Sequence, residues 1–117
     1  MKHILFRMAV FSVATICSQA YGHHSAAATF LNNEQVTVEG VISRYNFRNP
    51  HVNIFFEVEN ADGSTTDWLA EGESATTLRR AGWTNNTLAE GDRIRISGNA
   101  TIDGSPMVWI LSAAILD

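Results

Sequence analysis

Short runs of alternating apolar and polar residues constrain the fold of this chain more than any other feature. In the run QVTVEGVISRYNF, residues 35–47, the side chains of Val36, Val38 and Ile42 share one phase, with Gly40 between them. A period of two places alternate side chains on opposite faces of a strand, so this run predicts a half-buried β-strand. A glycine inside the run indicates a bulge or a tight bend.

Four further runs predict strands, and turn residues separate them. They are VNIFFEVE, STTDWLAEG, RIRISGNA and MVWILSAAIL, at residues 52–59, 64–72, 93–100 and 107–116. The Asp-Gly phrases NADG and DGSP are typical of turns between such strands. The phrase RNPH interrupts the first pair, because proline donates no hydrogen bond and holds the residue before it in an extended conformation.

Residues 74–81 predict a short helix between the third and fourth strands. Ser74 is a typical N-cap, Leu78 supplies an apolar contact, and Gly82 is a typical C-cap. Three strands, a helix and two strands predict an all-β, OB-fold-like barrel of five strands, with the helix between strands 3 and 4. The alternative is an open meander with the helix packed on one face.

The beginning of the chain has the layout of a secretory leader. The basic residues Lys2 and Arg7 are followed by an apolar run that is too short for a permanent anchor, and then by small residues. Small residues at the required spacing allow cleavage after Ala20 or Gly22. We expect a periplasmic or secreted bacterial protein without a transmembrane anchor. The expected parts are a signal peptide, a lead-in segment and an OB-like barrel domain, at residues 1–22, 23–34 and 35–117.

The composition after cleavage excludes several kinds of site. Cys17, the only cysteine, lies in the leader, so the mature chain has no disulfide and no Cys-based zinc site. Without Lys2 and Arg7, six basic residues stand against twelve acidic ones, a net charge near −6. Because phosphate contacts need a basic surface, we expect no nucleic-acid partner.

His23, His24 and His51 are the candidate metal ligands. Cleavage after Ala20 would place His23 third, where the amine, two amide nitrogens and one imidazole can enclose Cu(II) in a plane. Cleavage after Gly22 would make His23 the first residue, which chelates copper through its amine and imidazole, and a second imidazole could complete the site. The alternative is that His23 and His24 are only solvated. His51 would then hydrogen-bond backbone where the second strand begins.

Asn49, Trp68 and Glu71 are candidate ligand-binding residues near the same predicted face. The loop that holds Asn49 borders the usual OB-fold ligand face, and aromatic side chains such as Trp68 line clefts in these barrels. For the two other tryptophans we predict structural roles, with Trp109 in the core and Trp83 closing one end of the barrel.

Glu71 and Glu73 flank Gly72 just before the predicted helix. A carboxylate pair can bind a cation, but acids ahead of a helix also complement its dipole, and we favour that interpretation. Arg79 and Arg80 are expected to pair with these acids at the surface, and the alternative is that they form a small anion site.

Several phrases together resemble one family. HHSAAATF, VTVEGVI, NPH, WLAEG, LRRAGW, LAEGDRIRISG and DGSP, in this order, resemble DUF6152, a family of small exported bacterial proteins of unknown function. The resemblance covers nearly all of the chain after the leader. It implies export, a small β-domain and a leader that ends close to the histidine pair, and it implies no activity. Leu31 departs from the pattern, which has an acidic residue after the phenylalanine.

No pattern of nucleophile, base and orienting group occurs, and there is no Gly-rich phosphate loop, so we expect no enzyme. The sequence favours an exported binding module that binds Cu(II), its candidate cofactor, through the amino-terminal histidines. The alternative is a metal-free adaptor or small-ligand-binding domain, whose partner would be an envelope protein or a small molecule.

Overall fold

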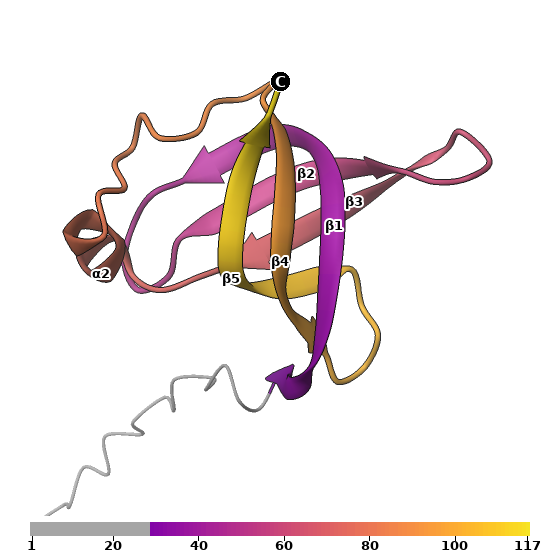
Figure 1. The fold of residues 1–117 in the computed structure, drawn as a ribbon, viewed down its shortest axis with the longest axis horizontal. Helices are drawn as coiled ribbons and strands as arrows, with labels where there is room; N and C mark the ends of the chain where they lie inside the picture. Colours follow the sequence, from indigo (N-terminus) through magenta and orange to yellow (C-terminus); the bar gives the residue numbers. More distant parts are fainter. Residues whose placement is uncertain (1–28) are drawn as a thin grey trace, which may run out of the picture.

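Five strands close into a ring in the computed structural model, which describes residues 29–117 (Figure 1). The order around the ring is β1-β2-β3-β5-β4, and every pairing is antiparallel except β3 with β5. This confirms the predicted five-stranded OB-fold-like barrel and excludes the open meander. The strands are β1 Phe30–Asn46, β2 Asn53–Glu59, β3 Thr65–Glu71, β4 Arg93–Thr101 and β5 Met107–Leu116.

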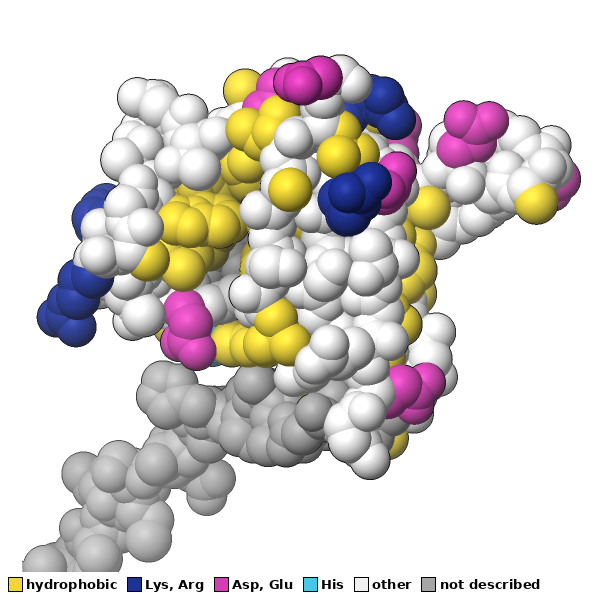
Figure 2. All heavy atoms as spheres, in the orientation of Figure 1, with side chains coloured by type: hydrophobic (Ala, Val, Ile, Leu, Met, Phe, Trp, Pro, Cys, Tyr) yellow, Lys and Arg dark blue, Asp and Glu magenta, His cyan; other side chains and the backbone are white. Residues whose placement is uncertain are grey.

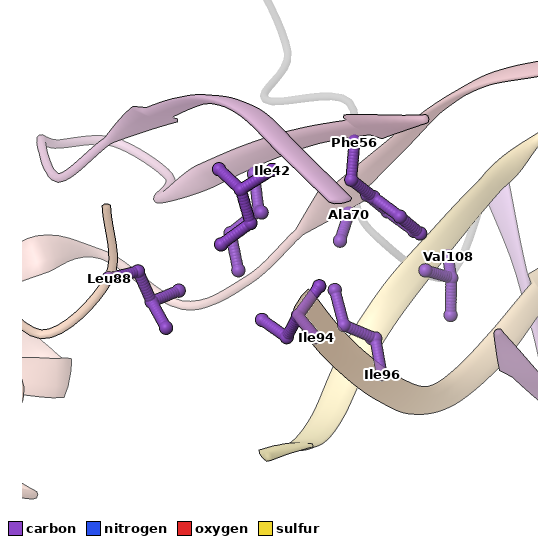
Figure 3. Packing of buried hydrophobic residues seen from close by; sticks show 8 residues of the cluster. Ile42, Phe56, Ala70, Leu88, Ile94, Ile96 and Val108 are labelled. Atoms are coloured by element: carbon purple, nitrogen blue, oxygen red, sulfur yellow. The ribbon is translucent and has the colours of Figure 1, made fainter. Parts of the chain in front are cut away.

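The core consists of the side chains that point inward from alternate positions of the strands. Ile54 and Phe56 of β2 alternate with outward residues, and Ile94 and Ile96 of β4 do the same. Their side chains meet inside the ring (Figure 3). The buried cluster is Ile42, Ile54, Phe56, Ala70, Leu88, Ile94, Ile96 and Val108. Period-two alternation therefore identified the interior correctly for β1, β2 and β4.

β1 is longer at its start than the sequence predicted. It begins at Phe30 rather than at Gln35, because Phe30 pairs with Thr101 of β4 and is buried. The ring of Phe30 lies 5.8 Å from that of Trp109 in β5. This contact stabilises the start of the strand without an alternating pattern, so residues 30–34 belong to the barrel rather than to a lead-in segment.

Gly40 does not form the predicted bulge. The irregularity in the β1–β2 register lies further on, between Ile42 and Arg44. A side chain at Gly40 would collide with the carbonyl oxygen of Glu57 and would lie 2.8 Å from Cδ2 of Phe56. Glycine is therefore required because β1 approaches β2 closely here.

The helix α2, Ala75–Arg80, lies between β3 and β4 as predicted. Ser74 caps it, its side-chain oxygen accepting a hydrogen bond from the amide of Thr77 at 3.1 Å. Gly82 follows with φ +93°, in the left-handed region that glycine adopts without strain. The short helix therefore begins and ends where the sequence indicates.

The long connection from α2 to β4 is attached to the barrel by buried side chains. Leu88 belongs to the core cluster, and Trp83 packs against it. The hydroxyl of Tyr45 donates to the carbonyl of Thr84 at 2.9 Å, and burial raises the pKa of Tyr45 to about 12. Trp83 thus lies against the core, in agreement with a structural role.

The two Asp-Gly turns are built alike. In the β2–β3 turn the amide of Ser64 donates to Oδ1 of Asp62 at 2.9 Å, and in the β4–β5 turn the amide of Ser105 donates to Oδ1 of Asp103 at 3.0 Å. These hydrogen bonds and those from the serine hydroxyls stabilise the charged carboxylates, so they lower the pKa of both aspartates.

Gly98→Ala should destabilise the barrel strongly. A side chain there would overlap the carbonyl oxygen of Trp109 and lie 2.9 Å from Cγ2 of Val108. β4 and β5 would have to separate, so we expect unfolding to become easier by about 2 kcal/mol, in the range of overpacked sites. Urea unfolding followed by circular dichroism measures the change. The exposed substitution Ser112→Ala on β5 is the control, and equal stability of the two variants would contradict the prediction.

Candidate functional site

The candidate site lies on the outside of the barrel, where the β1–β2 loop meets the end of β3. The strand register places Asn53 of β2 opposite Glu71 of β3, and Glu71 opposite Trp109 of β5. The neighbouring positions Ile54, Ala70 and Val108 are buried in the core, so this row of side chains faces outward. The loop residue His51 joins the row just before β2 begins.

His51 is held by three neighbours. Its Nδ1 lies 3.0 Å from the carbonyl oxygen of Gly72, and its Nε2 lies 3.8 Å from Oε1 of Glu71. The imidazole meets the indole of Trp109 edge-on, with 5.6 Å between ring centroids. The predicted hydrogen bond from His51 to backbone is therefore confirmed.

The bond to Gly72 sets the tautomer of His51. A carbonyl oxygen only accepts, so Nδ1 carries the hydrogen and donates it. Nε2 of the neutral ring is then left with its lone pair, facing the carboxylate of Glu71. Both side chains are partly exposed, with 32 % and 26 % of their surfaces in contact with solvent.

The backbone around His51 is equally fixed. The amide of Val52 donates to the carbonyl of Glu73 at 3.0 Å, and the amide of Gly72 donates to the carbonyl of Val52 at 2.9 Å. These two bonds continue the β2–β3 ladder beyond the strand ends. They place His51 beside the Glu71–Gly72 peptide on a rigid edge rather than on a free loop.

The prediction that Glu71 complements the dipole of the helix is wrong. It is the last residue of β3, and the first turn of α2 contains no acidic residue. The cross-strand register, rather than distance along the chain, decides its neighbour, which is His51. Glu73 is exposed.

The predicted pairing of the two helix arginines with these acids is also wrong. In the described part of the chain the acidic and basic side chains in contact are Arg95 with Glu39 and His51 with Glu71, the second an ion pair only when His51 is protonated. The guanidinium of Arg79 lies 5.2 Å above the ring of Phe47 instead. An exposed guanidinium over an aromatic ring gains about as much free energy as a surface ion pair, and it remains in contact with water. The contact of Arg79 with Phe47 can therefore replace an ion pair with an acidic side chain.

Trp109 and Trp68 lie on opposite sides of the sheet wall. Trp109, predicted in the core, faces outward between Phe30 and His51, because its neighbour Val108 takes the inward position. Trp68 packs against the core cluster, with its ring 6.3 Å from that of Phe56.

Asn49 ties the site loop to the helix. Its Oδ1 accepts from the amide of Thr76 at 3.1 Å, and its Nδ2 donates to the hydroxyl oxygen of Thr76 at 3.1 Å. Both polar groups of this side chain are therefore engaged within the protein, and the loop that carries His51 is held to the start of α2.

A surface hollow of about 410 Å³ brings three of the predicted residues together. Asn49, His51 and Glu71 line it, and Trp68 instead lines a second hollow of about 400 Å³ on the same sheet face. His23 and His24, the other predicted ligands, lie outside the described residues. The first hollow is lined by Arg48, Asn49, Pro50, His51, Asn53, Leu69 and Glu71.

The proximity of His51 and Glu71 was not predicted, although a signal for it exists in the sequence. The turn NADG fixes which residues pair across the hairpin, so counting outward from it gives Asn53 opposite Glu71. The same count places Val52 opposite Gly72, so His51 shares the outward face of Asn53 and lies diagonally across from Glu71. Hairpin counting, rather than a search for local metal-binding spacing, finds this pair.

Within residues 29–117, no three side chains of the types His, Cys, Asp and Glu gather closely enough to hold a metal ion among themselves. Nor does that range contain a helix of the length and apolarity needed to span a bilayer. The described residues thus define a small OB-fold barrel with a histidine–carboxylate pair on its outer face.

The chain belongs to DUF6152, a family of unknown function, whose model matches residues 9–108. This confirms the resemblance seen in the sequence. No curated protein matches the chain significantly.

Solved structures show similarity of fold alone. The mitochondrial single-stranded DNA binding protein Rim1 from S. cerevisiae is 10 % identical, with a TM-score of 0.55, over 72 % of this chain and 94 % of that chain. The N-terminal domain of the PriB protein from Thermoanaerobacter tencongensis is 18 % identical, with a TM-score of 0.53, over 73 % of this chain and 98 % of that chain. At such low identity the shared barrel carries no information on ligands.

Asn49→Ala should loosen the site loop and destabilise the protein by about 1 kcal/mol. The substitution leaves the amide of Thr76 without its acceptor, a loss comparable to that of a helix cap. Thermal unfolding of the variant measures the effect. Asn85→Ala, at an exposed position of the α2–β4 connection, is the matched control. Identical melting of both variants and the parent would show that the tie contributes nothing.

Proposed function

We propose that this protein is an exported module that binds copper through the histidines of its processed amino terminus together with His51. The orientation of His51 carries the proposal. A metal-ligating imidazole typically donates its other ring N–H to a carbonyl or carboxylate, which fixes the tautomer and the ring. His51 has this arrangement with Gly72, and it lines the surface hollow together with Glu71, which lies 3.8 Å from its Nε2.

The amino-terminal histidines are within reach of His51 by chain length. Phe30, the first residue of β1, contacts Trp109, which in turn contacts His51. His24 precedes Phe30 by six residues, and such a segment spans up to about 20 Å. The histidines are therefore tethered close to the fixed imidazole.

Cleavage of the leader generates the remaining ligands. With Tyr21 first, the amine, two amide nitrogens and His23 supply four nitrogens in a plane, a geometry that favours Cu(II) and leaves His51 only a position outside that plane. With His23 first, the amine and its own imidazole supply two nitrogens, and the imidazole of His51 supplies a third. Export is part of the proposal. Without cleavage of the leader, the free amine would belong to Met1, far along the chain from the histidines.

Nucleic acid is a poor fit to the surface that OB-folds usually offer to it. The outward side chains of β2 and β3 include the carboxylates of Glu57, Asp67 and Glu71. Phe55, an aromatic on this face, is covered by the guanidinium of Arg44 at 4.0 Å. On the side of the barrel where β4 and β5 lie in front, Figure 2 shows basic side chains as separate spots. We propose that neither DNA nor RNA is the ligand.

The second candidate is a metal-free adaptor or small-ligand-binding domain. The two hollows on the β2–β3 face, of about 400 and 410 Å³, favour it. They are shallow surfaces edged by Phe55 and Leu69, suited to a peptide or a small organic molecule. Neither candidate function is enzymatic.

Correctly processed protein should bind one Cu(II) more tightly than protein that retains extra residues before the cleavage site. Both proposed geometries use the free amine, which a leader or tag removes. Intact mass establishes whether the chain begins at Tyr21 or His23, and isothermal titration with Cu(II) gives the affinity. The His23→Ala, His24→Ala double variant is the control. Equal affinity in the double variant and the parent would refute the proposal.

Single-stranded DNA should not bind measurably at low salt. The acidic β2–β3 face repels phosphates. Few cationic side chains are present to neutralise phosphates and so release the counterions whose release drives binding. Fluorescence anisotropy of a labelled oligothymidine, with protein up to about 50 μM in 20 mM salt, tests this, since nonspecific binders reach dissociation constants of roughly 10⁻⁴–10⁻⁶ M even at physiological salt. Binding that weakens steeply as salt is added would overturn the exclusion of nucleic acid.

A further inference from the structure

The lone pairs of two half-buried groups converge at the outer face of the barrel. In the neutral ring, the tautomer set by Gly72 leaves Nε2 of His51 without a hydrogen, and Oε1 of Glu71 stands 3.8 Å from it. Two electron-pair donors do not attract each other, and this distance is too long for a hydrogen bond. Either a proton on Nε2 or a metal ion between the two atoms turns this repulsion into attraction.

A shared Cu(II) ion would need the two ligand atoms closer together. Cu(II) favours a planar arrangement, in which bonds of about 2.0 Å place adjacent ligand atoms roughly 2.8 Å apart. The observed 3.8 Å is wider by about 1 Å, and rotation of the Glu71 side chain would have to bring Oε1 closer to Nε2.

We infer that Glu71 is a ligand of the same metal, and that His51 and Glu71 form a half-site for a divalent cation preorganised on the barrel. The inference rests on the proposed function for the remaining ligands, because the described residues supply only two. An imidazole and a carboxylate together favour Cu(II) over Cu(I), which prefers thiolate or thioether sulfur.

Both ligands stand on rigid elements. Glu71 ends β3, paired with Asn53 on one side and Trp109 on the other. Gly72 follows, and a side chain there would come within 3.3 Å of Cδ1 of Ile110, so the β3 end lies close against β5. Supports of this kind hold a site more accurately than loops do.

Trp109 forms one wall of the half-site and provides a local signal. Its indole lies 5.6 Å from the imidazole of His51, whereas Trp68 packs against the core and Trp83 lies beside α2 and β5 in a different hollow. Cu(II) quenches fluorescence at short range, so a metal held by His51 and Glu71 should quench Trp109. Trp109→Phe should remove most of that quenching.

The test is Cu(II) titration of full-length processed protein carrying Glu71→Gln, compared with Glu73→Gln. Both substitutions remove one carboxylate charge, but Glu73 is exposed and lies outside the hollow that holds His51. Even outer partners of metal ligands contribute roughly 10–100-fold to affinity, so loss of a direct ligand should weaken binding about tenfold or more. Glu73→Gln should leave the affinity within about twofold. Urea unfolding of each variant verifies that it is folded.

Glu71→Asp separates ligation from simple attraction. It keeps the charge but shortens the side chain by one methylene, so a ligand role predicts weaker binding and an altered visible Cu(II) spectrum. An attraction at a distance would predict neither change. Copper affinity and spectrum unchanged in both Glu71→Gln and Glu71→Asp would overturn the inference and leave His51–Glu71 as an ion pair only.

The results distinguish this inference from the proposed function. Loss of binding in the His23→Ala, His24→Ala variant with normal binding in Glu71→Gln would support the amino-terminal site and refute a role for Glu71. Weak binding that survives in the double variant, quenches Trp109 and disappears in Glu71→Gln would support the half-site and refute the amino-terminal ligands. No binding of Cu(II) by the processed parent would refute both.

Discussion

The short parallel pairing of β3 with β5 is the contact on which the rest of this structure depends. It consists of the residue pairs Leu69–Met107, Ala70–Val108 and Glu71–Trp109. Without it the antiparallel pairs would form an open sheet with β3 and β5 as its edges. With it the ring closes, Ala70 and Val108 are buried in the core, and Glu71 and Trp109 become neighbours on the outside. The same pairing therefore completes both the fold and the candidate site.

His51 contributes both to the stability of the fold and to the candidate site. Its Nδ1–H satisfies the carbonyl of Gly72 at the end of the β2–β3 ladder, a bond that contributes about 1 kcal/mol in a typical protein. The same bond orients the ring and leaves Nε2 facing Glu71. Trp109 packs against the ring edge-on, so three neighbours hold the imidazole in one orientation. The hydrogen bond to the backbone that stabilises the fold thus also preorganises the imidazole of His51 for a ligand.

The fold and the surface of this protein point to different partners. Its barrel resembles those of single-stranded DNA binding proteins, with a TM-score of 0.55 for Rim1. Its net charge is −4 for the whole chain, and the β2–β3 face carries carboxylates with one aromatic ring beneath a guanidinium. Fold similarity constrains the backbone, whereas binding depends on side chains that two proteins at 10 % identity hardly share. The site residues themselves must therefore carry the functional argument.

The sequence by itself determined the local elements, and the tertiary structure decided which faces and partners they have. Alternation in β1, β2 and β4, the cap at Ser74 and the two Asp-Gly turns are short-range features, so the strands, the helix and their order could be predicted from them. The run MVWILSAAIL is apolar in both phases, and only its pairing with β3 and β4 turns Val108 inward and Trp109 outward. The partner of Glu71 depends on the β2–β3 register, which the NADG turn sets and which placed Glu71 beside His51 rather than at the helix. The contact of Glu71 with Trp109 follows from ring closure, and no local pattern encodes it.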